Sequence, residues 1–138
     1  MMSNLSRFEE INVLASNADW AWPVALRDIF RPRGVNLLVA ESADEFVSVI
    51  RQRRIHTAIV DMDCERRGGL ATIKIIRMDY PLLPCIMLTS EVDEAVLRKA
   101  LGLDVFAVVY KPVDMDILQQ LLNRLFVKKY ASDIFADR

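Results

Sequence analysis

A short acidic stretch, Ala58–Leu70 (AIVDMDCERRGGL), holds the residues of this chain best suited to chemistry. An apolar run ends there on Asp61, and two further acids, Asp63 and Glu65, follow at alternate positions before a Gly-Gly pair opens a helical pattern. Open α/β sheets place their functional groups where a buried strand runs into a loop and then a helix, at the carboxyl end of the strand. The same pattern is also typical of an ordinary surface loop, so other residues have to distinguish the two.

Polar groups also follow two later apolar runs. Thr89 comes directly after residues 85–88, and Lys111 with Pro112 follows residues 107–110. An aspartate carboxylate can attack a phosphoryl donor and form an acyl phosphate. Because the transferring group carries spread negative charge, such a site needs a cation and a hydrogen-bond donor beside the carboxylate. Lys111 and Thr89 can supply them beside Asp61; the alternative is a solvated lysine at a strand end and a turn threonine.

These groups are positioned by alternating strand and helix patterns. Short apolar runs predict strands at about Ile11–Ala15, Val35–Ala40, Ile55–Val60, Cys85–Leu88 and Ala107–Val109. Helical patterns predict helices at about Trp20–Phe30, after Ser42, at Gly69–Met78, at Glu91–Leu101 and after Asp114. Ser42 and Glu45 form a capping-box pattern. This alternation predicts an α/β domain with a five-stranded parallel sheet covered by helices on both faces.

The composition indicates one folded domain. The chain has 138 residues, of which 53% are hydrophobic and 27% charged, and its net charge is -1. A charge near zero argues against nucleic-acid or membrane partners, and no apolar run is long enough to span a bilayer. Cys64, Cys85 and the single His56 have no metal-like spacing, so we expect a cytoplasmic protein without zinc or disulfides. We assign residues 1–10 to an N-terminal extension, 11–127 to the domain and 128–138 to a charged C-terminal tail, for which the sequence identifies no partner surface.

From about residue 11 to residue 126 the chain resembles the receiver domain of bacterial two-component response regulators. The resemblance depends on the order and spacing of Asp61, Gly69, Thr89 and the Lys111-Pro112 pair, of which the last is the most specific. It implies a doubly wound, flavodoxin-like sheet with strand order 2-1-3-4-5. It also implies that Asp61 is the phosphoacceptor and that Thr89 and Lys111 assist it.

The resemblance implies a Mg²⁺ site as well, and here the sequence departs from the family. Asp61 and the backbone carbonyl of Asp63 match family ligands, whereas the two acids that usually end the first strand are replaced by Asn17 and Ala18. Asn17 keeps an oxygen ligand without the charge, so we expect Mg²⁺ binding to be weak or absent. A second departure is Val108, where the family usually has an aromatic switch residue.

Two functions of different kinds follow. The first is a receiver, not an enzyme in its own right, that accepts a phosphoryl group on Asp61 from a histidine kinase or phosphotransfer protein in a phosphorelay. The alternative is a degenerate pseudo-receiver that serves as a phosphorylation-independent interaction or dimerisation module. For either, the resemblance implies a partner or homodimer face on the fourth helix, fifth strand and fifth helix. A flavodoxin-like nucleotide binder is disfavoured, because the first predicted strand is not followed by a glycine-rich phosphate loop.

Overall fold

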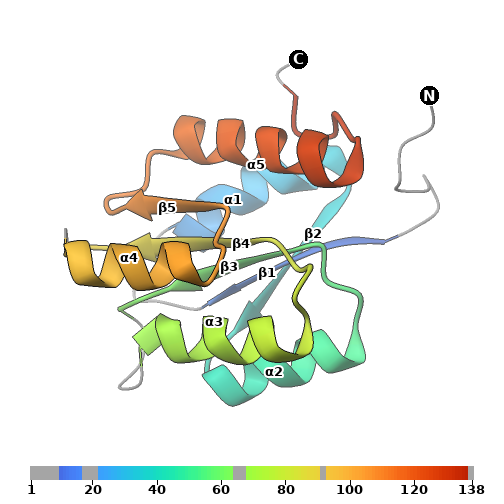
Figure 1. Cartoon of the computed structure of the whole chain (residues 1–138). Coiled ribbons are helices and arrows are strands. Elements are labelled where there is room, and N and C mark those ends of the chain that lie inside the picture. The colour runs from blue at the N-terminus through green and yellow to red at the C-terminus, as the bar shows by residue number, and fades with distance from the viewer. Residues whose placement is uncertain (1–9, 17–21, 64–67, 91–92, 137–138) are drawn as a thin grey trace.

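The computed structural model describes residues 10–16, 22–63, 68–90 and 93–136 (Figure 1). Its strands form one parallel sheet in the order β2-β1-β3-β4-β5. They are β1 (Ile11–Ser16), β2 (Val35–Ala40), β3 (Thr57–Asp61), β4 (Cys85–Thr89) and β5 (Ala107–Tyr110). The order and the parallel arrangement confirm the predicted doubly wound fold.

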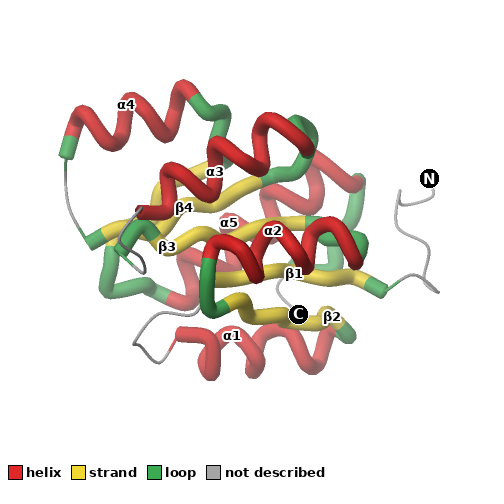
Figure 2. The backbone as a smooth tube through the Cα atoms, turned by 90° about the horizontal axis from the view of Figure 1, so that it is seen from below, coloured by secondary structure: helices red, strands yellow, loops and turns green. Residues whose placement is uncertain are grey.

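Helices cover both faces of this sheet, as the alternation predicts (Figure 2). They are α1 (Trp22–Phe30), α2 (Ala43–Gln52), α3 (Gly68–Asp79), α4 (Glu94–Gly102) and α5 (Met115–Tyr130), with a short 3-10 turn at Arg31–Arg33. One buried cluster joins the sheet to α1 and α5, and a second joins it to α2, α3 and α4. Alternate residues of the central strands enter opposite clusters: Ile59 faces α1 and α5, and its neighbour Val60 faces the other layer. Both faces of β3 are therefore apolar, and its polar last residue, Asp61, lies at the carboxyl end of the strands.

Side-chain caps fix where several helices begin. Ser42 Oγ accepts a hydrogen bond from Glu45 N at 3.0 Å, and Asp114 accepts from the first-turn amides of α5. The Ser42 cap was predicted, and the last helix was expected to begin after Asp114. The Glu45 carboxylate accepts from the backbone N–H of Glu41, the residue before the cap, at 3.4 Å. Helix α4 begins at Glu94 with Asp93 as its cap, later than the predicted start at Glu91. Such caps satisfy backbone amides that have no partner inside the helix.

The segment after α5, for which the sequence identified no partner surface, packs on the domain. Helix α5 continues to Tyr130, and Ala131 then turns the backbone with a φ of 51°. Phe135 is fully buried, with its ring centroid 5.3 Å from that of Phe30 and 4.8 Å from that of Phe126. The described part of the chain beyond the predicted boundary at residue 127 therefore contributes to the core. In the ranges that the structure describes, no helix is both long and apolar enough to cross a membrane.

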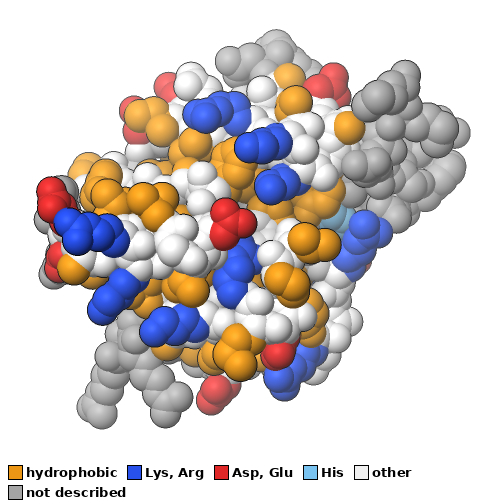
Figure 3. Space-filling model, viewed as in Figure 1, with side chains coloured by type: hydrophobic (Ala, Val, Ile, Leu, Met, Phe, Trp, Pro, Cys, Tyr) orange, Lys and Arg blue, Asp and Glu red, His pale blue; other side chains and the backbone are white. Residues whose placement is uncertain are grey.

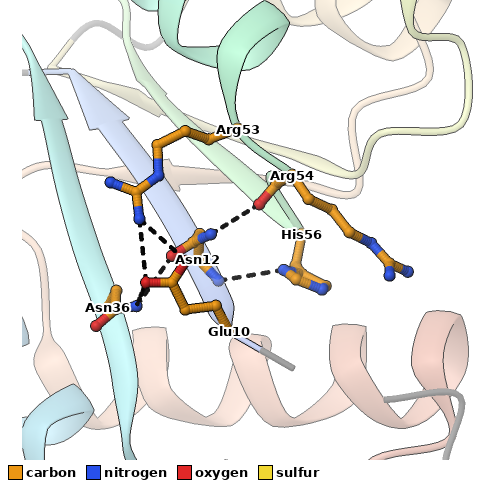
Figure 4. Close-up of polar contacts among 6 residues, drawn as sticks. All are labelled: Glu10, Asn12, Asn36, Arg53, Arg54 and His56. Carbon is orange, nitrogen blue, oxygen red and sulfur yellow. Dashed lines mark hydrogen bonds and ion pairs between the residues drawn. The ribbon is translucent and has the colours of Figure 1, made fainter. Parts of the chain in front are cut away.

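A buried polar network lies at the amino end of β1 and β3 (Figure 4). Asn12 and His56 are both buried there, and Asn12 N donates to His56 Nδ1 at 3.1 Å. The Asn12 side-chain amide donates to the Arg54 carbonyl at 2.9 Å. From α5, the Tyr130 hydroxyl donates to the His56 carbonyl. These bonds fix the register of β1 against β3 at the end of the sheet opposite Asp61.

Candidate functional site

Asp61 is the last residue of β3 and is fully buried. Its backbone N–H donates to Ser16 Oγ, at the end of the neighbouring strand β1, at 3.3 Å. The next residue, Met62, donates its N–H to the Leu88 carbonyl of β4 at 2.8 Å. The two flanking strands therefore hold the backbone on either side of the carboxylate, at the carboxyl edge of the sheet where this fold places its ligands.

Lys111 reaches this carboxylate from the end of β5. Its backbone N–H donates to the Thr89 carbonyl at 2.9 Å, which fixes the start of the loop after β5. Its Nζ lies 2.5 Å from Asp61 Oδ2 and 3.1 Å from Asp63 Oδ2, and 18% of its side chain is exposed. The structure thus brings Asp61 and Lys111 into direct contact across the end of β4, which lies between β3 and β5 in the sheet.

Thr89 is the buried last residue of β4 and pairs with Tyr110 of β5. Its position, one residue beyond the β4 partner of Asp61, is at the edge of the sheet where the sequence analysis expected it. Its described backbone contact is the hydrogen bond from Lys111 N. The role of its hydroxyl as a donor to a phosphoryl group stays a prediction.

The side chain of Asp63 is a site component that the sequence analysis missed. Asp63 Oδ2 accepts from Ser90 N at 3.1 Å and from Lys111 Nζ at 3.1 Å. The Asp63 N–H donates to Asp61 Oδ1 at 2.7 Å. Burial alone would raise the pKa of Asp63, but hydrogen bonds from Lys111 and Ser90 and the charge of Lys111 outweigh it and hold that pKa below its usual range. The alternation of acids at 61 and 63 was the available signal, and it was assigned only a backbone role.

Gly69, at the start of α3, lies against the backbone that carries Asp61. A Cβ added there would meet the Asp61 carbonyl oxygen at 2.9 Å and Val60 Cγ1 at 2.9 Å. Only a residue without a side chain leaves this close approach unstrained. The glycine that the family resemblance singled out therefore has a steric reason, because it lets α3 start directly beside the phosphoacceptor candidate.

The oxygens at this site are of the kind that Mg²⁺ prefers. Asp61 and Asp63 supply two carboxylates, and the backbone carbonyl of Asp63 is a third hard donor. Asn17, predicted as a weak ligand, lies outside the described residues, as does Ala18. Among the described positions, no group of three or more His, Cys, Asp or Glu residues could hold a metal ion. The present donors are chemically compatible with Mg²⁺, and the metal itself stays a prediction.

The fold and site together define a doubly wound α/β domain with an aspartate–lysine pair at its carboxyl edge. Residues 22–123 match the model of the response regulator receiver domain, and the chain belongs to this family. It is 27% identical over 127 residues to the transcriptional regulatory protein ZraR of Escherichia coli O157:H7, covering 91% of this chain and 28% of that protein. The chain thus spans about a quarter of the length of these curated relatives.

Two solved structures share this fold. A response regulator receiver protein from Pseudomonas putida is 26% identical, with a TM-score of 0.76 over 84% of this chain and 98% of that chain. A signal receiver domain of an HD-domain-containing protein from Pseudomonas fluorescens Pf-5 has a TM-score of 0.79 at 19% identity, covering 88% of this chain and 98% of that one. The second similarity, at this identity, concerns the fold alone.

Proposed function

We propose that this receiver domain accepts a phosphoryl group on Asp61 from a phosphohistidine of a histidine kinase or phosphotransfer protein. The observation that carries the proposal is the contact of 2.5 Å between Lys111 Nζ and the buried Asp61 carboxylate. Removing a charge from water is costly unless a partner compensates it. A site that had lost its function would therefore gain nothing from keeping a buried aspartate together with its lysine. Retention of both charges supports phosphorylation over the pseudo-receiver alternative.

The chemistry is an in-line displacement at phosphorus. A carboxylate oxygen of Asp61 forms the new bond to phosphorus while the bond from phosphorus to the donor nitrogen breaks, and the leaving imidazole keeps the electron pair. Lys111 lies where its charge offsets the negative charge that develops on the phosphoryl oxygens. Thr89, at the end of β4, is the proposed hydroxyl donor. The chain is a substrate of its kinase in this proposal and not an enzyme.

Mg²⁺ would be held by Asp61, by the backbone carbonyl of Asp63 and weakly by Asn17. When bound, the ion would neutralise charge on the phosphoryl group, which is its usual contribution to phosphoryl transfer. Because Asn17 and Ala18 replace acids of the family, we expect a low affinity for the ion in this chain.

The proposed partner surface is the face formed by α4, β5 and α5. Leu101, Tyr110 and Ile117 expose 59%, 41% and 51% of their surface, one on each element. Hydrophobic side chains lie between charged ones over α4 and α5 in Figure 3. Exposed apolar residues within a charged surface are typical of protein interfaces. Homodimerisation through this face, and transmission without an aromatic residue at Val108, stay predictions, as does a cytoplasmic location.

The direct test is phosphorylation by acetyl phosphate with and without Mg²⁺, followed by intact-mass analysis. We expect the parent chain to gain one phosphoryl group that hydroxylamine removes, and Asp61→Asn to gain none. Asp133→Asn is the matched control, because it removes an exposed acid outside the site and should behave like the parent.

A second variant distinguishes a weak metal site from a lost function. Asn17→Asp with Ala18→Asp restores the two family acids, so Mg²⁺ should raise the melting temperature of this variant and increase its phosphorylation. Failure of both the parent and a correctly folded, Mg²⁺-binding double variant to accept phosphate would favour the pseudo-receiver.

A further inference from the structure

Two hydrogen-bond donors converge on a single oxygen of Asp63. The backbone N–H of Ser90 and Nζ of Lys111 both lie 3.1 Å from Asp63 Oδ2. The two donors come from the ends of β4 and β5, and the same ammonium also contacts Asp61. The Asp63 carboxylate therefore occupies a small anion-binding site formed by donors that directly follow the neighbouring strands β4 and β5.

This donor set matches what a phosphoryl group on Asp61 would need. An ammonium and an oriented backbone N–H are the groups that stabilise oxyanions in proteins. Because Lys111 Nζ lies 2.5 Å from Asp61 Oδ2, a group bound to that carboxylate would lie within reach of the same ammonium. Its oxygens would therefore compete with the Asp63 carboxylate for Lys111.

From this geometry we infer that Asp63 is a built-in anion that occupies the phosphoryl-oxygen site beside Asp61 and has to be displaced when phosphate or a phosphoryl group enters. The inference rests on the proposed function, since it assigns a regulator to the same site. Asp63 acts through Lys111 and Ser90, and it is thus a positioning residue. While it is in place, it keeps both donors oriented and opposes entry of a second anion.

Displacement is feasible because Asp63 differs from Asp61 in its exposure. Asp61 has no exposed surface, whereas 34% of the Asp63 side chain reaches solvent. An exposed carboxylate that leaves its site regains water, so its departure costs less than burial of an unpaired charge.

The test is binding of inorganic phosphate in the absence of Mg²⁺, followed through the ¹⁵N chemical shift of the Ser90 amide. Asp63→Asn keeps the size of the side chain and removes its charge. Loss of one negative charge beside Lys111 should tighten phosphate binding about tenfold relative to the parent. Asp133→Asn changes the net charge equally, far from these donors in sequence, and should leave the affinity within about twofold.

Two further variants guard against a trivial explanation. Asp63→Ala should give the same gain, which shows that the lost charge and not the new amide is responsible. Adding Lys111→Met to Asp63→Asn should abolish the gain, because the incoming anion then has no ammonium to bind. Each variant is compared only after its thermal unfolding shows a folded chain.

Equal phosphate affinity of the parent, Asp63→Asn and Asp63→Ala would overturn the inference. Tighter binding in Asp133→Asn as well would also overturn it, since the effect would then come from net charge. Phosphoryl transfer from acetyl phosphate is measured separately on the same variants. If phosphate binding tightens while no variant is phosphorylated, the inference about Asp63 stands and the proposed function fails. If the parent is phosphorylated but phosphate affinity does not change in any variant, the proposed function stands and the inference about Asp63 fails.

Discussion

Asp61 is a carboxylate without exposed surface, and its environment explains how it stays there. Lys111 compensates its charge, and the Asp63 N–H donates to the other carboxylate oxygen. Removing one member of a buried ion pair costs about 3–5 kcal/mol, because the remaining charge is left without a partner. Lys111 is partly exposed, so the loss on its substitution should lie below that range. Local stability and phosphoryl chemistry therefore depend on the same pair of side chains.

Gly69 provides a prediction about this site. In Gly69→Ala the new methyl group would meet the Asp61 carbonyl oxygen and Val60 Cγ1 at 2.9 Å, so backbone must shift. We expect a loss of about 1–3 kcal/mol in the free energy of unfolding, together with slower phosphorylation, because the shift moves Asp61. Urea unfolding and the acetyl phosphate assay measure the two effects.

Gly102→Ala is the matched control for this substitution. A Cβ at Gly102, the last residue of α4, meets nothing within 4 Å. Alanine there should be neutral or stabilise the chain by up to about 1 kcal/mol, since it restricts the unfolded state. Equal behaviour of the two alanine variants would contradict a steric role for Gly69.

The site could be predicted where backbone geometry alone decides it. Asp61 ends β3 and Lys111 directly follows β5 in one parallel sheet, and their contact follows once the strand order is known. The side chain of Asp63 lies in the loop after β3, so its contacts depend on loop conformation, which has no periodic signal in the sequence. The Ser90 N–H was missed for a related reason, because every residue except proline carries that donor.

Strands and helices were predictable because both faces of this sheet are buried. Each strand reads as a short continuous apolar run, and each helix carries one apolar stripe. Boundaries were less accurate. The third strand was predicted from Ile55, whereas β3 begins at Thr57 because His56 belongs to the polar network before it.

The C-terminal segment was mispredicted because charged neighbours hide its apolar residues. Lys128 and Lys129 lie in the last turn of α5 and Asp133 follows, so Ile134 and Phe135 are the only large apolar side chains after Tyr130. No helical or strand period connects those two residues to the rest of the chain. Their burial depends on the turn at Ala131, which brings the segment back onto α1 and α5.

Phe135 tests whether this segment stabilises the domain. Its ring is fully buried between Phe30 and Phe126, so Phe135→Ala should lower the free energy of unfolding by about 3 kcal/mol. Val127→Ala on α5 is the control; its parent side chain is 52% exposed, and we expect a change within about 0.5 kcal/mol. Urea unfolding monitored by circular dichroism gives both values. Indistinguishable midpoints for the two variants would mean that residues 131–136 do not pack in solution.

The two ends of the sheet differ in what they hold. The carboxyl end carries Asp61, Asp63 and Lys111. Asp61 is buried, whereas the side chains of Asp63 and Lys111 are partly exposed to solvent. The amino end is closed by the buried network of Asn12 and His56, which α5 joins through Tyr130. Rigid hydrogen bonding at one end and exchangeable charges at the other suit a domain that changes state at a single edge.

Tyr130 links the stability of the whole domain to alkaline pH. Burial raises the pKa of Tyr130 to about 12, against the opposing charge of Arg54. In the unfolded chain the pKa of a tyrosine is about 10. Because the pKa of Tyr130 is higher in the folded chain, the contribution of its protonated hydroxyl to the free energy of unfolding is complete below pH 10 and is lost as the pH rises toward 12. Tyr130→Phe removes the hydrogen bond to the His56 carbonyl, so we expect it to be less stable than the parent by about 1 kcal/mol at pH 7.

Between pH 10 and pH 12 the stability advantage of the parent over Tyr130→Phe should shrink and then reverse, because only the parent must keep a partly buried phenol protonated as it folds. Urea unfolding at half-unit steps of pH measures it. Tyr110→Phe is the control: Tyr110 is 41% exposed, and we expect this variant to follow the parent. A difference between parent and Tyr130→Phe that stays constant to pH 12 would show that Tyr130 is already solvated in the folded chain, and that the contact between α5 and the amino end of β3 is open.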